Sequence, residues 1–349
     1  MSAPPDPAAP PALDVLGIGN AIVDVLSRAD DAFLEARGLD KGGMRLIGAE
    51  EAERLYGEMG PGIESSGGSG ANTCAVAAML GARVGFLGKV ADDQLGRVFA
   101  HDIRAVGVRF PTAPLPAGPG APPTARCLIL VTPDGQRTMN TFLGACVHFS
   151  PADVEEAAVA SAAVTYLEGY LFDPPAAQAA FLAASRAAHA AGRRVAITLS
   201  DPFCVGRHRE AFRRFVREEA DILFANQAEL LSLYETDSFD RAADLARGEV
   251  ALAALTRGAQ GSVVVAGEET HRVEARPTRV VDTTGAGDAY AAGFLAALTR
   301  GLPLPECGRW GAVAAAEVIA QFGARPQTNL AAAVAAGAPG NRNVSAVLG

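Results

Sequence analysis

Short apolar runs alternate with amphipathic segments along most of this chain. Apolar runs bounded by turn residues predict buried strands, at 13–19, 84–88, 163–167, 195–199, 222–225, 250–256 and 262–266. Apolar residues at helical spacing fall between these runs, most clearly at 71–80 and at 176–191, where Gly192 follows as a C-terminal cap. Strands and helices in this alternation predict an α/β fold with a mainly parallel sheet covered by helices.

Two stretches interrupt the alternation. One, 25–47, holds short β-type patches around a helical 31–37 segment, and the other, 108–142, is proline-rich up to Pro123 and β-type after it. The turn Pro133-Asp134-Gly135 separates two apolar runs, which is a strong hairpin signal. We therefore expect these stretches to form a small β-rich lid over the carboxyl ends of the parallel strands, where open α/β sheets bind ligands. The predicted large domain is then 12–24, 48–107 and 143–335, with a disordered tail at 1–11 and a second tail at 336–349.

Composition excludes several classes of function. A chain of 349 residues that is 49% hydrophobic can bury one large core or two modest ones. Its net charge of -9 argues against nucleic acid as a partner, and the one basic cluster, 207–217, is expected to be an amphipathic helix with a solvated basic face. The five cysteines and five histidines show no disulfide or metal-ligand spacing. Without a basic signal segment near the start or an apolar run long enough to span a membrane, we expect a soluble cytoplasmic protein.

The most informative motif is the heptapeptide DTTGAGD at 282–288. A β-type segment at 278–281 precedes it and a helix-type segment at 291–298 follows, so Gly285, Ala286 and Gly287 lie where a helix begins. Three backbone N–H groups at the positive end of a helix dipole form an anion site. Asp288 beside that site would repel a bound phosphate unless it contacts the attacking nucleophile, which indicates phosphoryl transfer. The alternative is a plain strand-turn-helix junction with an ordinary first-turn acid.

Two polar clusters at predicted strand and loop ends are suited to an acceptor. Asn20 and Asp24 follow the first strand, and an aspartate can accept bonds from two hydroxyls of a vicinal diol; the alternative is a turn Asn and a surface Asp. Gly67 and Gly68 allow close approach of the backbone to a ligand ahead of Asn72, and the alternative is a flexible loop with an N-cap Asn.

Two further clusters are suited to a nucleotide. Asn226 can bond a phosphate or base and Glu229 can hold Mg²⁺ through water, whereas the alternative is a helix start with a polar first turn. The segment from Thr256 through Gly258 to Gly261 forms either a floor for ribose and phosphate or a simple hairpin. Neither a dinucleotide-binding glycine motif nor a Walker A loop is present, so phosphate binding falls to 285–287.

These motifs, in this order across about 13–335, closely resemble the landmarks of the ribokinase-like (PfkB) carbohydrate and nucleoside kinases. The resemblance implies a three-layer α/β/α fold and an enzyme that uses ATP, Mg²⁺ and, in many members, a monovalent cation such as K⁺. It makes Asp288 the catalytic base and Gly285, Ala286 and Gly287 the anion hole. The remaining implied roles are acceptor binding by Asn20, Asp24, Gly67, Gly68 and Asn72; ATP binding by Asn226, Thr256, Gly258 and Gly261; Mg²⁺ binding through water by Glu229; cation binding by Asp282 and Thr284; and, for Arg137, a place over the phosphates.

The resemblance is less specific about which acceptor molecule is phosphorylated. The segment 19–24 (GNAIVD) and an aromatic Tyr170 suited to stacking on a base look like adenosine kinases, whereas Ser69-Gly70-Ala71 is closer to sugar kinases. We expect phosphorylation of the 5′-hydroxyl of a nucleoside, adenosine first. The alternatives are a kinase for ribose, fructose or a related free sugar, and a non-catalytic ligand-binding homologue. The expected partner is a small molecule, with neither nucleic acid nor membrane, and the expected state is a monomer or homodimer.

Overall fold

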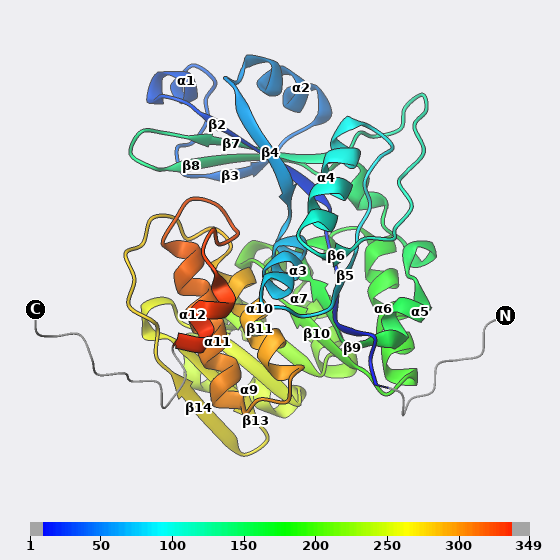
Figure 1. Cartoon of the computed structure of the whole chain (residues 1–349), viewed down its shortest axis with the longest axis vertical. Coiled ribbons are helices and arrows are strands. Elements are labelled where there is room, and N and C mark those ends of the chain that lie inside the picture. Colours follow the sequence, from blue (N-terminus) through cyan, green and yellow to red (C-terminus); the bar gives the residue numbers. More distant parts are fainter. Residues whose placement is uncertain (1–9, 337–349) are drawn as a thin grey trace, which may run out of the picture.

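The computed structural model describes residues 10–336, and within them two sheets of different size lie one above the other (Figure 1). The large sheet has nine strands in the order β14-β13-β12-β11-β10-β9-β1-β5-β6. All neighbours are parallel except β12/β13 and β13/β14. The strands are β1 (Leu13–Ile18), β5 (Val84–Leu87), β6 (Val108–Arg109), β9 (Ala162–Glu168), β10 (Arg194–Thr198), β11 (Ile222–Asn226), β12 (Leu252–Thr256), β13 (Ser262–Ala266) and β14 (Glu269–Val273). The seven buried strands predicted from the apolar runs are all confirmed.

Helices cover both faces of the large sheet. Its central strands are therefore buried on both sides and consist of almost unbroken apolar runs. One face packs against α3 (Ser69–Met79), α4 (Gln94–Ala105), α10 (Ala286–Leu298), α11 (Leu304–Ile319) and α12 (Leu330–Ala336). The other packs against α5 (Glu156–Ser161), α6 (Pro175–Ala190), α7 (Pro202–Glu219), α8 (Gln227–Tyr234) and α9 (Phe239–Glu249). Adjacent residues of one strand enter opposite cores, as Tyr166 and Leu167 of β9 do. The predicted three-layer α/β/α architecture is confirmed.

The small sheet, called the lid below, has the order β3-β8-β7-β2-β4. Its strands are β3 (Met44–Leu46), β8 (Arg137–Phe142), β7 (Ala125–Val131), β2 (Ile22–Arg28) and β4 (Gly62–Gly67), and α1 (Asp31–Glu35) and α2 (Ala49–Glu58) lie on its outer side. The predicted hairpin around 133–135 is confirmed, since β7 and β8 pair antiparallel. Short 3-10 turns occur at Gly144–His148, Pro151–Asp153, Gly169–Phe172 and Gly258–Gln260.

Three sequence-based assignments differ from the structure. β4 pairs with β2 in the lid although 62–67 was expected in the large domain, because its polar sequence GIESSG gives no strand signal. β6 lies in the large sheet, although 108–109 was expected in the lid. The segment 278–281 is not a strand: Val281 N donates to Ile319 O, and Val280 is 58% exposed, so its β-branched residues have no neighbouring strand. The tails at 1–9 and 337–349 lie outside the described residues.

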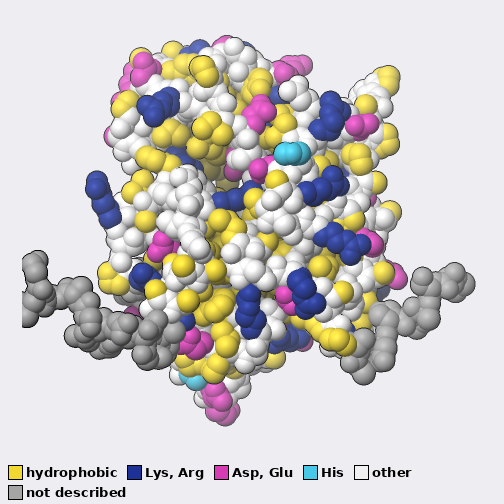
Figure 2. Space-filling view, in the orientation of Figure 1, with side chains coloured by type: hydrophobic (Ala, Val, Ile, Leu, Met, Phe, Trp, Pro, Cys, Tyr) yellow, Lys and Arg dark blue, Asp and Glu magenta, His cyan; other side chains and the backbone are white. Residues whose placement is uncertain are grey.

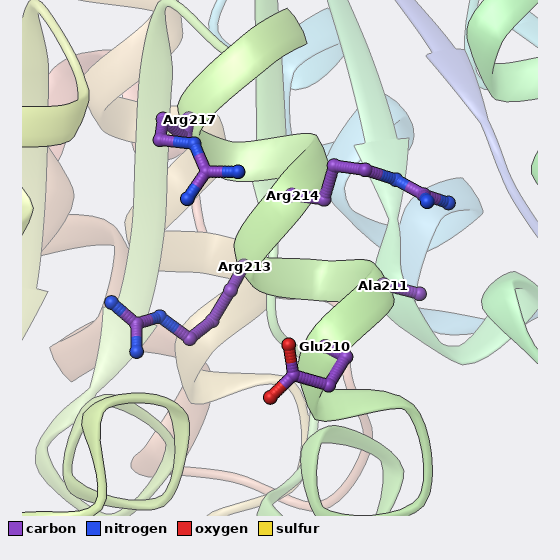
Figure 3. Close-up of a pocket in the computed structure, with 5 residues that line it drawn as sticks. All are labelled: Glu210, Ala211, Arg213, Arg214 and Arg217. Atoms are coloured by element: carbon purple, nitrogen blue, oxygen red, sulfur yellow. The ribbon is translucent and has the colours of Figure 1, made fainter.

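The basic cluster on α7 is an amphipathic helix, as predicted. Phe212 and Phe215 are buried, while Arg213, Arg214 and Arg217 extend outward from the helix (Figure 3). Most arginines of the 207–217 cluster have acidic partners, for example Arg209 with Glu235 and Arg213 with Glu249. Acidic and basic side chains are likewise interspersed over the face shown in Figure 2. Within 10–336, no helix is long and apolar enough to cross a membrane.

Candidate active site

A cleft of about 760 Å³ separates the inner face of the lid from the carboxyl ends of the large-sheet strands. The surface is hollowed between the two parts, and hydrophobic side chains gather along the lid margin (Figure 2). Five strands of the large sheet end at this cleft, so residues that are far apart in the sequence meet there. They are Asn20 after β1, Glu168 and Tyr170 at β9, Ser200 after β10, Asn226 at β11 and Thr256 at β12.

The anion cradle lies at the N-terminus of α10. Gly285 precedes the helix with φ +75°, and a Cβ at this position would overlap Ala324. Gly287 has open space around its Cα and borders the cleft. We expected the N–H groups of Gly285, Ala286 and Gly287 to be free, but Ala286 N donates to Thr283 O at 3.2 Å. Within the described residues, the N–H groups of Gly285, Gly287 and Asp288 have no acceptor, so an electropositive cradle remains on the cleft side.

Asp288 is the carboxylate beside this cradle. Its Oδ1 accepts a hydrogen bond of 2.6 Å from Ser69 Oγ. The pKa of Asp288 is raised to about 6, because burial and then the charge on Asp24 raise it more than the side chains of Ser69, Asn72 and Arg325 lower it. The group is therefore a stronger base than a free aspartate and still ionised at neutral pH, which suits general-base chemistry.

Asp24 faces the same cleft from β2. Within the described part of the chain its carboxylate accepts no hydrogen bond, and burial raises its pKa to about 6. A Cβ on Gly67 would overlap this carboxylate, and a Cβ on Gly68 would overlap the carbonyl oxygen of Asn20. Glycine is needed at these positions so that the two loops can pack together. Gly68 borders the cleft, whereas Gly67 lies behind Asp24 and does not line it.

Asn20 was expected to bind acceptor hydroxyls, but the structure gives its amide a different partner. Its backbone N and its Nδ2 donate to Glu168 at 2.9 and 3.0 Å, and Gly70 N donates to the same carboxylate at 2.9 Å. Glu168 is buried, and burial raises its pKa to about 7. It thus ties the loop after β1 to the glycine loop ahead of α3.

The residues that were expected to bind a nucleotide divide into two groups, those that line the cleft and those that do not. Asn226 and Glu229 border the cleft but form a capping box: Glu229 N donates to Asn226 Oδ1 and Asn226 N donates to Glu229 Oε2, each at 2.9 Å. Thr256 also lines the cleft. Gly258 and Gly261 do not, because they form the turn between β12 and β13, where a Cβ on Gly261 would overlap Val273 O.

The expected cation ligand Asp282 already has a cationic partner. Its Oδ2 lies 2.9 Å from Arg137 Nη2, and both side chains are 6% exposed. Asp282 also accepts from Thr284 N at 3.0 Å and from Gly323 N at 3.1 Å. Arg137 therefore lies against the loop leading to the cradle rather than in the cleft. Thr284 lines the cleft, whereas Asp282 does not. Within 10–336, no group of three or more His, Cys, Asp or Glu residues is arranged to hold a metal ion.

Apolar side chains from both the lid and the large domain line the cleft. Ile129, Met139 and Leu143 face it from the lid, and Tyr170 and Phe203 border it from the large domain. Phe203, at the start of α7, is 79% exposed, and Leu46 of β3 is 56% exposed. A polar ligand alone does not account for such exposure of large apolar side chains around a cleft.

Sequence reasoning missed several of these residues. Ser69 was passed over inside its glycine loop although it is the hydroxyl that bonds Asp288. Glu168 at the carboxyl end of β9 has a detectable signal, since an acid that ends a buried parallel strand points to the ligand edge of the sheet. Phe203 was given no role in the site, because its place at the cleft depends on how α7 is oriented.

Known proteins resemble this chain along most of its length. A model described as "pfkB family carbohydrate kinase" matches residues 44–330. The structure of adenosine kinase from Sinorhizobium meliloti superposes with a TM-score of 0.86 at 56% identity, covering 93% of this chain and 99% of that one. A probable sugar kinase protein from Rhizobium etli gives 0.85 at 50% identity, covering 93% and 98%. Cytidine kinase from Thermococcus kodakarensis is 27% identical over 80% of this chain and 96% of its own.

Proposed function

The chain belongs to the pfkB family of carbohydrate kinases, and on that premise we propose that it transfers the γ-phosphoryl group of ATP to the 5′-hydroxyl of a nucleoside, most favourably adenosine. One observation supports the choice of a nucleoside over a free sugar: large apolar side chains line the same cleft as Asp24 and Asp288. A free sugar presents hydroxyls on every side and has no surface that would bury Met139, Leu143 and Phe203. A nucleobase presents a flat apolar face that suits them and Tyr170.

We propose that the acceptor binds with its ribose against Asp24. The carboxylate accepts bonds from the 2′- and 3′-hydroxyls, for which it has unused lone pairs. The 5′-oxygen then lies toward Asp288. As this oxygen bonds to the γ-phosphorus, its proton passes to Asp288 and the bond between phosphorus and the β,γ-bridging oxygen breaks, leaving ADP. The N–H groups of Gly285, Gly287 and Asp288 stabilise the charge on the moving phosphoryl group.

For ATP and Mg²⁺ we propose the part of the cleft bordered by Asn226, Glu229, Thr256 and Thr284. Bound Mg²⁺ would neutralise charge on the β- and γ-phosphates. Glu229 suits a water-mediated contact, because its carboxylate is fixed by Asn226 and borders the cleft. A monovalent cation at Asp282 would have to displace the Arg137 guanidinium, so we assign K⁺ no residue there.

A free-sugar acceptor is the second candidate, supported by the probable sugar kinase at 50% identity. A non-catalytic ligand-binding role is disfavoured, because the carboxylate and the free N–H groups of the cradle are both present.

The deciding experiment is an ADP-release assay with Mg·ATP, with and without K⁺, on adenosine, guanosine, inosine, cytidine, ribose and fructose. We expect saturable turnover with adenosine at micromolar KM and little with either sugar. Phe203→Ala should raise the KM for adenosine at least about tenfold, since it removes an apolar contact to the base. Its matched control is Leu245→Ala, which truncates an exposed side chain on α9. Turnover with a sugar and none with any nucleoside would replace the proposal by its alternative.

A further inference from the structure

Arg325 lies in the loop between α11 and α12, and its side chain reaches Asn72, which lines the cleft. Its Nε donates to Asn72 Oδ1 at 3.0 Å, and its Nη1 donates to Asp102 Oδ2 at 3.2 Å. The side chain is 17% exposed, and the buried Nη2 has no hydrogen-bond partner among the described residues. Asp102 of α4 also accepts from Ser66 N at 2.8 Å, so the guanidinium joins three separate elements.

The contact with Asn72 determines which way its amide faces. An asparagine side chain presents an oxygen acceptor on one side and an NH₂ donor on the other, and its neighbours decide between the two orientations. A guanidinium can only donate, so the amide oxygen must face Arg325. The NH₂ group then points away from Arg325, and the Asn72 side chain lowers the pKa of Asp288, as a donor beside that carboxylate would. Asn72 is 6% exposed, so no bulk water competes for either orientation.

We propose that Arg325 is a positioning residue for phosphoryl transfer: it fixes the Asn72 amide so that Nδ2 donates to Asp288, and it supplies the positive charge next to the Asp24 and Asp288 carboxylates. This inference rests on the proposed function, in which Asp288 is the base. Without Arg325 the amide can rotate by half a turn and present its oxygen to Asp288. Two acceptors would then face each other, and the proton-accepting carboxylate would be displaced from the 5′-oxygen.

The electrostatic surroundings of Asp288 make the charge of Arg325 consequential. Acidic or phenolic groups interact with Asp288 from several elements, namely Asp24 of β2, Glu168 and Tyr166 of β9, Tyr170 after it and Glu229 of α8. Arg325 is the cation that lowers the pKa of Asp288, and with Arg137 it lowers that of Asp24. Removing its charge should raise the pKa of both carboxyls.

The test compares Arg325→Met and Arg325→Lys with the wild type. Arg309→Met is the matched control, because Arg309 is a similarly covered arginine (19% exposed) that bonds Glu306 and Val334 O away from the cleft. We expect Arg325→Met to lower kcat by about 10- to 100-fold and to move the acid limb of the kcat/KM profile upward by about one pH unit. Arg325→Lys should restore the acid limb, and Arg309→Met should leave both unchanged. Equal profiles for Arg325→Met and Arg309→Met would overturn the proposal.

A second measurement tests the role of Arg325 without any substrate, and a second variant is available if the first does not fold. Hydrogen exchange of the Asn72 side-chain NH₂, followed by NMR, should be slow in the wild type and at least about tenfold faster in Arg325→Met. Arg325→Gln takes its place if the Met variant does not fold, because Gln keeps bulk and hydrogen bonding but can also present an oxygen. A wild type inactive on every acceptor would refute the proposed function. Unchanged exchange in the folded variant would refute the role of Arg325.

Discussion

At the scale of single residues, the site is defined by carboxylates held out of water. Asp24 and Asp288 both have their pKa raised to about 6 by burial, and Glu168 has its pKa raised to about 7. Enzymes use such buried environments to shift the pKa of a carboxyl group toward neutral pH. The sequence showed that Asp288 lies in the first turn of this helix, but not that it would be buried, because burial depends on residues from other elements such as Ser69, which bonds it.

The first prediction concerns the base itself. Asp288→Asn keeps the shape of the side chain but removes its ability to accept a proton, so kcat should fall at least about 100-fold. Substrate binding and the folded state should be largely retained, as measured by calorimetry and circular dichroism. Retention of more than a few per cent of activity would show that Asp288 is not the base.

The same substitution has a pH-dependent effect on stability. The folded pKa of Asp288, about 6, lies above the 3.8 of the unfolded chain, so the native state favours the protonated carboxyl. Its contribution is fully present below pH 3.8 and is lost as the pH rises through about 6. Asp288→Asn, which cannot ionise, should therefore be more stable than the wild type at pH 8, by about 1–3 kcal/mol. The difference should shrink toward zero at pH 4 in urea titrations, and a difference independent of pH would contradict the assignment.

At the scale of elements, the start of α10 shows how far local sequence can be interpreted. Two glycines around one small residue predicted a helix N-terminus with exposed N–H groups, and α10 begins at Ala286 as expected. The strand expected before it, at 278–281, was wrong, because β-branched residues form a strand only beside a partner. The exact set of free N–H groups also depended on the turn at Thr283, which the sequence does not specify.

The two glycines of this cradle should respond differently to alanine. Gly285→Ala places a Cβ at φ +75° against Ala324, so it should destabilise the fold by about 1–3 kcal/mol. Gly287→Ala meets open space at a helical position, so stability should stay equal or rise by about 0.5–1 kcal/mol. Its methyl group would occupy the side of the cradle that borders the cleft, and kcat should fall. Thermal unfolding and turnover of both variants check this contrast, and equal effects of the two substitutions would exclude it.

At the scale of the whole molecule, the lid and the large domain are joined by contacts between distant segments. Arg137 of the lid pairs with Asp282 beside the cradle, and within the large domain Arg325 bonds Asn72, from which it is 253 residues distant in the sequence. The three-layer fold was predictable, since it follows from the periodicity of each segment. These pairings were not, because they depend on how segments distant in the sequence pack against one another. β4 was assigned to the wrong part because its polar sequence gives no strand signal.

The Arg137–Asp282 pair predicts a measurable coupling between the two parts. Arg137 Nη2 lies 2.9 Å from Asp282 Oδ2, and both side chains are shielded from solvent, so their charges interact more strongly than a surface pair. Arg137→Met or Asp282→Asn alone should each lower stability, while the double variant should cost less than their sum. A double-mutant cycle by urea unfolding should give a coupling of about 1–3 kcal/mol, against less than about 0.5 kcal/mol for the control pair Arg309–Glu306, which lies within one helix.

Because Asp282 also accepts hydrogen bonds from Thr284 N and Gly323 N, each single variant should reduce kcat/KM as the loop leading to Gly285 loosens. Strict additivity in stability, with unchanged kcat/KM in both single variants, would show that the lid contact has no influence on the cradle.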